Sequence, residues 1–112
     1  MINVRLTGTS AFKKKLKAKT KYVKEITDQE INKGCQYIEA SMKADTPVKT
    51  GVLRSSEGYK KIKDMEYEVF AAAEYAADVE ARQKAKGESF FEANVERGKE
   101  IINRSIRSKL KI

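Results

Sequence analysis

Residues 44–56, ADTPVKTGVLRSS, contain the only proline of the chain and mark a change in its hydrophobic pattern. A long lysine-rich segment with helical periodicity precedes them, and residues with the alternation of a strand follow. Proline pushes the residue before it out of the α-helical region, so Thr46-Pro47 ends the helix. Gly51 then permits a turn conformation that other residues resist. The stretch therefore predicts a helix that stops before Thr46 and a sheet that continues after the turn.

Before residues 44–56, the sequence predicts one strand and a long helix. Residues 2–7 alternate between apolar and polar types, which is typical of a short, half-buried strand. A helical pattern then runs from an N-cap at Ser10 to about Lys43. Its apolar stripe shifts by roughly a quarter turn near residues 27–34, where TDQE fits a capping box. Three interpretations stay open: two helices, one helix with a kink at this point, or one long curved helix.

After residues 44–56, the pattern predicts a hairpin and a short helix. Residues 65–71 alternate clearly, and a weaker pattern over residues 53–63 indicates a partner strand. Lys63-Asp64 would join the two as a tight turn. The alanines and glutamates of AEYAADVEA, residues 73–81, favour a short helix over an extended edge.

The C-terminal part completes an α+β fold. Ser89 and Glu92 form a second capping box, and apolar residues at helical spacing follow it as far as Leu110. We therefore predict one domain over residues 1–112, a small antiparallel sheet packed by the long N-terminal helix and a C-terminal helix. The apolar side chains expected to be buried are Leu16, Val23, Ile38, Val95, Ile102 and Ile106.

The residue types exclude most enzyme chemistry. The chain has no histidine, the residue that general acid–base catalysis near neutral pH usually recruits. The single cysteine, Cys35, falls on the apolar side of a helix and is expected to be a buried thiol. No zinc site and no phosphate-binding glycine loop can be assembled from these residues. The sequence predicts a protein that is not an enzyme, with no catalytic or metal site, no cofactor and no small-molecule substrate.

Composition also predicts a folded protein away from the membrane. Apolar residues make up 40 % and charged residues 36 % of the chain, which is too apolar for a disordered segment. The first residues, MINVRLTGTS, lack the apolar core of a signal peptide, and no apolar run approaches the length of a membrane span. A soluble, cytoplasmic protein is expected.

The net charge of +8 is unevenly distributed. Residues 1–63 carry fifteen basic and six acidic side chains, a net charge of +9, whereas residues 64–103 carry five basic and ten acidic ones, a net charge of −5. Seven lysines fall within FKKKLKAKTKYVK, residues 12–24. Such a stripe can follow a phosphate backbone without sequence specificity, or it can meet an acidic protein surface. The run has no arginine, and its aromatic residues are not interleaved as stacking platforms, which favours a solvated helix face or a protein partner over DNA.

Three motifs follow one another along the chain: TPVKTGVLRSS at residues 46–56, EYAADVE at residues 74–80 and SFFEANVERG at residues 89–98. Together they resemble the small neck or tail-completion proteins of tailed bacteriophages, over about residues 10–110. The matching residues are Thr46, Pro47, Val48, Thr50, Gly51, Leu53, Arg54 and Ser55 in the first motif, Tyr75, Ala76, Val79 and Glu80 in the second, and Phe90, Phe91 and Ala93 in the third.

The chain departs from the family pattern at two places. Glu80 is followed by Ala81-Arg82, where the family commonly has Gly-Thr. Glu88-Ser89 stands where a proline usually precedes the phenylalanine. Both departures fall in or next to the loop before the C-terminal helix.

The resemblance implies a structural role in virion assembly. Such proteins form rings of identical subunits at the head–tail junction, contact adjacent neck or tail proteins, and complete or join the tail. The expected location is the virion, and the host cytoplasm during assembly. The alternative interpretation is a small basic DNA-binding accessory protein without sequence specificity.

Two surfaces and one ion pair are predicted on this basis. Lys13, Lys17, Lys21 and Lys24 are the candidates for the face that meets a neighbouring subunit, an adjacent neck protein or the packaged DNA. The candidates for the opposite, acidic face are Glu74, Asp78 and Glu80. Arg54 and Glu80 are expected to pair near the base of the hairpin, inside the subunit.

Overall fold

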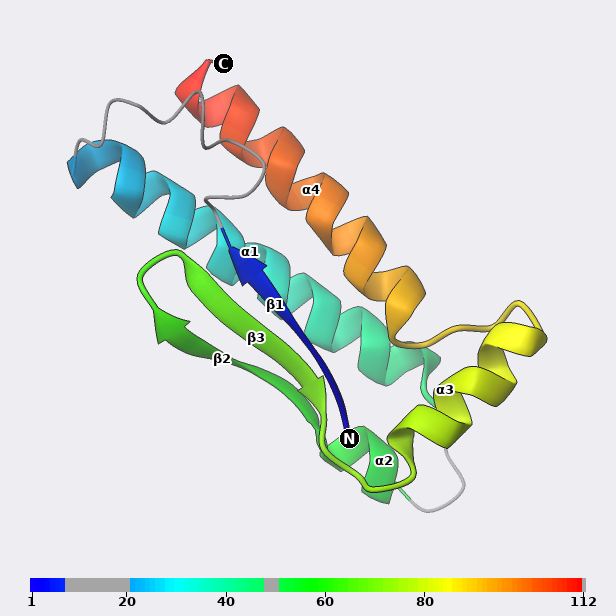
Figure 1. Ribbon diagram of the computed structural model, residues 1–112. Coiled ribbons are helices and arrows are strands. Elements are labelled where there is room, and N and C mark those ends of the chain that lie inside the picture. The colour runs from blue at the N-terminus through cyan, green and yellow to red at the C-terminus, as the bar shows by residue number, and fades with distance from the viewer. Residues whose placement is uncertain (8–20, 48–50, 112) are drawn as a thin grey trace.

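The computed structural model describes residues 1–7, 21–47 and 51–111, which form a three-stranded sheet and four helices (Figure 1). In chain order the elements are β1 Ile2–Thr7, α1 Lys21–Asp45, α2 Val52–Ser55, β2 Glu57–Lys63, β3 Glu66–Ala71, α3 Ala76–Ala85 and α4 Glu92–Leu110. The sheet is antiparallel with the order β1-β3-β2. The predicted α+β class, with an antiparallel sheet packed by the long first helix and the C-terminal helix, is confirmed.

The central strand β3 turns one face to the helices and the other face away from them. Tyr67, Val69 and Ala71 point to the helical layer and are buried. On the other face, Glu68 is the register partner of Arg5 on β1 and of Lys60 on β2, with ion-pair distances of 3.8 and 3.5 Å. A central acidic residue between two basic edge residues favours this strand order.

Helices α1 and α4 pack against each other in antiparallel orientation through two glycines (Figure 1). A Cβ atom on Gly34 of α1 would lie 2.1 Å from Cγ1 of Ile102. A Cβ atom on Gly98 of α4 would lie 2.2 Å from Cγ1 of Ile38. Each helix therefore has a glycine followed four residues later by an isoleucine, and each isoleucine occupies the space above the other helix's glycine. This reciprocal contact brings the two backbones close together.

The course of α1 bears on the predicted break near residues 27–34. Helix α1 is continuous from Lys21 to Asp45, so the two-helix interpretation was wrong. The apolar stripe looked interrupted because Thr27, Glu30 and Gly34 are not apolar, yet all three are buried and continue the stripe. The part of the predicted helix before Lys21 lies outside the described residues.

The hairpin is attached to α1 by Asp28. Its carboxylate accepts hydrogen bonds from the backbone N–H of Met65 (2.9 Å), the hydroxyl of Tyr67 (3.1 Å) and the ammonium of Lys61 (3.2 Å). Met65 has a positive φ of 62°, which is uncommon for a residue with a side chain. The turn therefore lies at Asp64-Met65, one residue later than predicted, and Asp28 holds its backbone.

The pKa of Asp28 predicts an acid-sensitive contribution to stability. Burial by itself would raise this pKa, but the hydrogen bonds from Met65, Lys61 and Tyr67 outweigh it, and the pKa lies below its ordinary value of 3.8. Because the pKa is lower in the folded state, this stabilisation is present above about pH 4 and is lost as the pH falls through the folded-state value. We expect Asp28→Asn to lose less stability than the wild type between pH 5 and pH 3, measured by urea denaturation. Asp64→Asn, a change at an exposed carboxylate of the same hairpin, is the matched control and should keep the wild-type slope.

Most of the predicted core positions are buried. Ile38, Val95, Ile102 and Ile106 are buried as expected, and Val23 is only half-buried. Leu16 lies outside the described residues. Residues 76–85 form the predicted short helix, α3. In the portion of the chain that the structure describes, no helix has the length and apolar character needed to cross a membrane.

Candidate protein-binding groove

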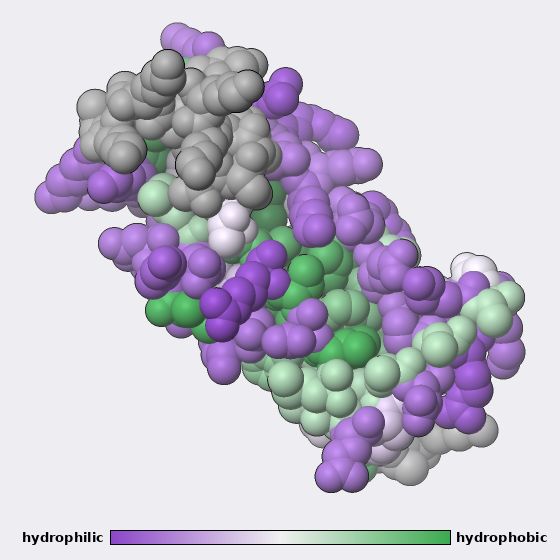
Figure 2. Space-filling model, viewed as in Figure 1, coloured by the Kyte–Doolittle hydropathy of each residue, from purple (hydrophilic) through white to green (hydrophobic). Residues whose placement is uncertain are grey.

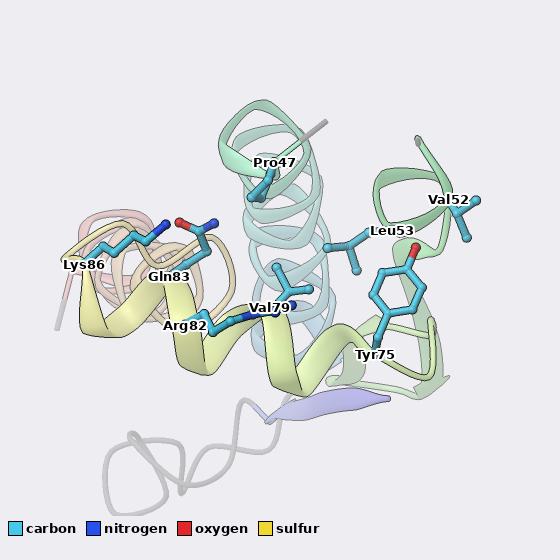
Figure 3. A pocket seen from close by; sticks show the side chains of 8 residues that line it. All are labelled: Pro47, Val52, Leu53, Tyr75, Val79, Arg82, Gln83 and Lys86. Carbon is cyan, nitrogen blue, oxygen red and sulfur yellow. The ribbon is translucent and has the colours of Figure 1, made fainter. Parts of the chain in front are cut away.

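The first two sequence motifs meet at one groove at the end of the molecule. The groove has a volume of about 640 Å³ and lies between α3 on one side and the end of α1 with α2 on the other. Figure 3 shows Val79 and Gln83 projecting from α3 towards Pro47 and Leu53. The lining residues are Pro47, Val52, Leu53, Tyr75, Val79, Arg82, Gln83 and Lys86.

The first motif builds one wall of the groove by ending α1 and starting α2. The backbone N–H of Thr46 donates to the carbonyl of Met42, in the last turn of α1, at 3.0 Å. Pro47 follows and lines the groove. Gly51 adopts a positive φ of 75° before α2, which favours glycine. Leu53 is buried and lines the groove as well, so this motif both ends the helix and shapes the wall. Thr50 and Val48 lie outside the described residues.

A buried carboxylate supports this wall from behind. Glu57, the first residue of β2, is 4 % exposed, and its Oε2 accepts a hydrogen bond of 2.5 Å from Thr46. Burial raises the pKa of Glu57, although the hydrogen bond from Thr46 and the charges of Lys43 and Arg54 act in the opposite direction. Arg54, a motif residue, therefore exerts its charge on Glu57.

The second motif uses the two sides of α3 differently. Tyr75 and Val79 line the groove, and Tyr75 keeps 40 % of its surface exposed. Ala76 and Glu80 are the buried residues of this helix. The spacing Tyr-Ala-x-x-Val-Glu thus places one pair of side chains on the open groove and the other pair on the body of the protein.

Glu80 joins the second motif to the third. Its carboxylate accepts hydrogen bonds from the backbone N–H groups of Phe90, Phe91 and Glu92 and from the hydroxyl of Ser89, at 2.6–3.2 Å. These donors are the free N–H groups at the start of α4, which an anion stabilises. Glu80 therefore caps α4 from α3, and its side chain determines where α3 lies.

The cap corrects two predictions about Glu80. Its oxygens accept hydrogen bonds at the start of α4 and do not form the expected ion pair with Arg54. The charge of Arg54 acts on Glu57 instead. It is also buried, at 7 % exposure, so it does not belong to an acidic outer face. The predicted capping box is only half formed: the Ser89 hydroxyl accepts from the N–H of Ala93, while the Glu92 side chain pairs with Lys84.

Four lining residues were missed by sequence reasoning: Val52, Arg82, Gln83 and Lys86. A signal for three of them was available. Arg82, Gln83 and Lys86 follow Tyr75 and Val79 at spacings of three or four residues, which places them on the same face of a helix. Nothing in the sequence shows that this face lies opposite Pro47 and Leu53.

The remaining predicted surface residues are exposed where the structure describes them. Lys21 and Lys24 lie at the start of α1, and Lys13 and Lys17 are outside the described residues. Glu74 and Asp78 are exposed next to and within the first turn of α3. In Figure 1 the start of α1 and the start of α3 lie near opposite ends of the molecule, whose longest dimension is 47 Å.

A second hollow lies on the other side of α3. Figure 2 shows hydrophobic side chains at the surface in the middle of the face that carries β1. The hollow, of about 400 Å³, is bordered by Ile2, Val4 and Phe91. Its basic lining residues, Lys84 and Lys99, are paired with glutamates of α4, so their charges are compensated within the protein.

The described residues offer little for catalysis. Burial raises the pKa of the Cys35 thiol to about 12, which keeps it protonated at neutral pH. Within residues 1–7, 21–47 and 51–111, no three His, Cys, Asp or Glu side chains are grouped so that they could hold a metal ion. The groove between α3 and the end of α1 with α2 is lined by apolar side chains, Gln83 and two basic side chains, a composition suited to a protein segment.

The described residues form a small α+β fold with an open groove between α3 and the end of α1 with α2. The chain belongs to the HK97-gp10-like family, described as "Bacteriophage HK97-gp10, putative tail-component", whose pattern matches residues 10–81. The match spans more than half of the 112 residues and includes the first two motifs completely. The resemblance to phage tail and neck proteins is thereby confirmed. Searches of curated proteins and of solved structures gave no match.

Proposed function

We propose that this tail-component protein is one subunit of a ring at the junction between the phage head and tail. It acts by binding other subunits and adjacent neck or tail proteins, and not by catalysis. The observation that carries the proposal is the convergence of two family motifs on one open groove: Pro47 and Leu53 from the first, Tyr75 and Val79 from the second. Residues that line a groove without filling it are placed to receive a partner.

The distribution of charge supports a ring. A closed ring needs a heterologous interface, in which one face of a subunit meets a different face of its neighbour. The exposed lysines Lys21 and Lys24 and the exposed carboxylates Glu74 and Asp78 lie near opposite ends of an elongated molecule. This arrangement suits head-to-tail contact between copies, with attraction between the two ends.

Deletion of the gene tests the proposal. We expect lysates of the deletion mutant to contain heads and tails that are made but not joined, or tails that are incomplete, when viewed by negative-stain electron microscopy. Complementation with the wild-type gene should restore joined particles. Mutants that still release normal infectious particles would contradict the proposal, and so would the absence of the protein from purified virions.

A further inference from the structure

The charged side chains that line the groove are all basic. Arg82 and Lys86 are its charged lining residues, and both are basic. Among the ion pairs between described residues, neither has an acidic partner, whereas Lys84 on the opposite side of α3 lies 2.6 Å from Glu92. Figure 3 shows the side chains of Arg82 and Lys86 next to Val79 and Gln83, along the α3 side of the groove.

We propose that the groove binds a segment of another virion protein in which a large apolar side chain is flanked by carboxylates. The apolar side chain enters the space between Leu53, Val79 and Tyr75, of which Leu53 is buried, Val79 is half-buried and Tyr75 is exposed. The carboxylates meet Arg82 and Lys86 at the rim. An apolar anchor surrounded by charge-complementary groups is the usual composition of a specific protein contact. This inference deepens the proposed function and rests on it for the identity of the partner.

The charges argue against a second copy of this chain as the occupant. Outside the groove, the large apolar side chains exposed on the described residues are Met1, Tyr22, Tyr37 and Ile62. Each has a cation nearby in the chain or on the same helical face: the terminal amine beside Met1, Lys21 beside Tyr22, Lys33 one turn from Tyr37, and Lys61 and Lys63 on either side of Ile62. The carboxylates closest to them, Glu25, Glu30 and Asp64, are paired with these lysines, so such segments offer no free carboxylate to the basic rim. DNA supplies the anionic charge but not the apolar side chain.

The chemistry can be tested on the purified protein with two small probes. 4-Phenylbutyrate carries an aromatic ring and a carboxylate, and 4-phenylbutanol carries the same ring and a hydroxyl. In methyl NMR titrations at low salt, we expect 4-phenylbutyrate to shift the signals of Val52, Leu53 and Val79 and to bind two- to fivefold more tightly than the alcohol. The preference should vanish in Arg82→Ala/Lys86→Ala. It should persist in the control Arg97→Ala/Arg104→Ala, which removes two exposed arginines of α4. Equal affinities of the two probes, or shifts confined to other methyl groups, would overturn the proposal.

The identity of the partner can be tested in phage-producing cells. A photo-crosslinking phenylalanine derivative placed at Tyr75 should link to another virion protein, at a site with Asp or Glu within about four residues. The same derivative at Tyr37, an exposed tyrosine on α1, should not give this product. Links from position 75 to a second copy of the chain alone, without a link to another virion protein, or no link at all, would overturn the assignment. If gene deletion leaves particles normal while the NMR preference holds, the ring proposal fails and the chemistry of the groove stands.

Discussion

Gly34→Ala is expected to lower the free energy of unfolding by about 1–3 kcal/mol, although alanine is the better helix former. The added Cβ would lie 2.1 Å from Cγ1 and 2.4 Å from Cδ1 of Ile102. Carbon atoms of two side chains cannot approach each other so closely. Ile102 is buried and cannot move aside without strain. Either its rotamer must change or α1 and α4 must separate, and both weaken the core. Urea denaturation followed by circular dichroism measures the loss.

A double-mutant cycle identifies the cause. Ile102→Ala alone should cost about 2–5 kcal/mol, because it leaves a cavity in the core. In the double mutant the remaining Cβ of residue 102 is 3.7 Å from the new methyl group, an ordinary contact. The double mutant should therefore be more stable than the sum of the single changes predicts. Simple additivity would show that the close approach of the helices does not determine the loss.

Glu80→Ala is expected to cost about 2–4 kcal/mol, because it removes the acceptor from the start of α4. The N–H groups of Phe90 and Phe91 are buried, so water does not replace the carboxylate there. α3 is held to the body of the protein chiefly by Ala76 and Glu80, so its position should also loosen. Faster amide hydrogen exchange at Phe90, Phe91 and across α3 would report this effect.

Glu92→Ala is the matched control for the cap. Glu92 is also a glutamate at the start of α4, but it is exposed and pairs with Lys84 at the surface. Its replacement should cost less than about 1 kcal/mol. Glu80→Gln, which keeps one acceptor oxygen, should fall between the control and Glu80→Ala. If Glu80→Ala is no more destabilising than Glu92→Ala, the carboxylate is not the cap.

The periodicities predicted the elements because each has a buried face with the right spacing. The alternation in β1 and β3 and the stripe of α4 come from side chains that pack into one core. The break predicted within α1 shows the limit of this reasoning, because the helix is continuous there. Thr27, Glu30 and Gly34 are buried although none of them is apolar. Two of them contact α4: Gly34 leaves space for Ile102, and Glu30 lies 3.2 Å from Lys109. A pattern of apolar residues alone cannot show such positions.

The groove residues were predicted only in part, because their position depends on tertiary contacts that the sequence pattern does not show. The motifs identified Pro47, Leu53 and Tyr75. Pro47 ends a helix, Leu53 can anchor the segment that follows it, and Tyr75 belongs to the second motif. That they share one groove depends on the tertiary position of α3, which Glu80 determines by a contact across ten or more residues. The same dependence explains why Arg54 was assigned to the wrong carboxylate. Charge and spacing made Glu80 a plausible partner, but the start of α4 occupies its oxygens.

The central claim is that this protein forms a ring where the head meets the tail. Cryo-electron microscopy of the purified virion tests it most directly, by averaging images of the head–tail junction. We predict a closed ring at that level whose repeating unit fits the three-stranded sheet and the antiparallel α1–α4 pair, with the start of α1 of one copy near the start of α3 of the next. A junction without such a ring, or density of this fold only elsewhere in the particle, would contradict the account.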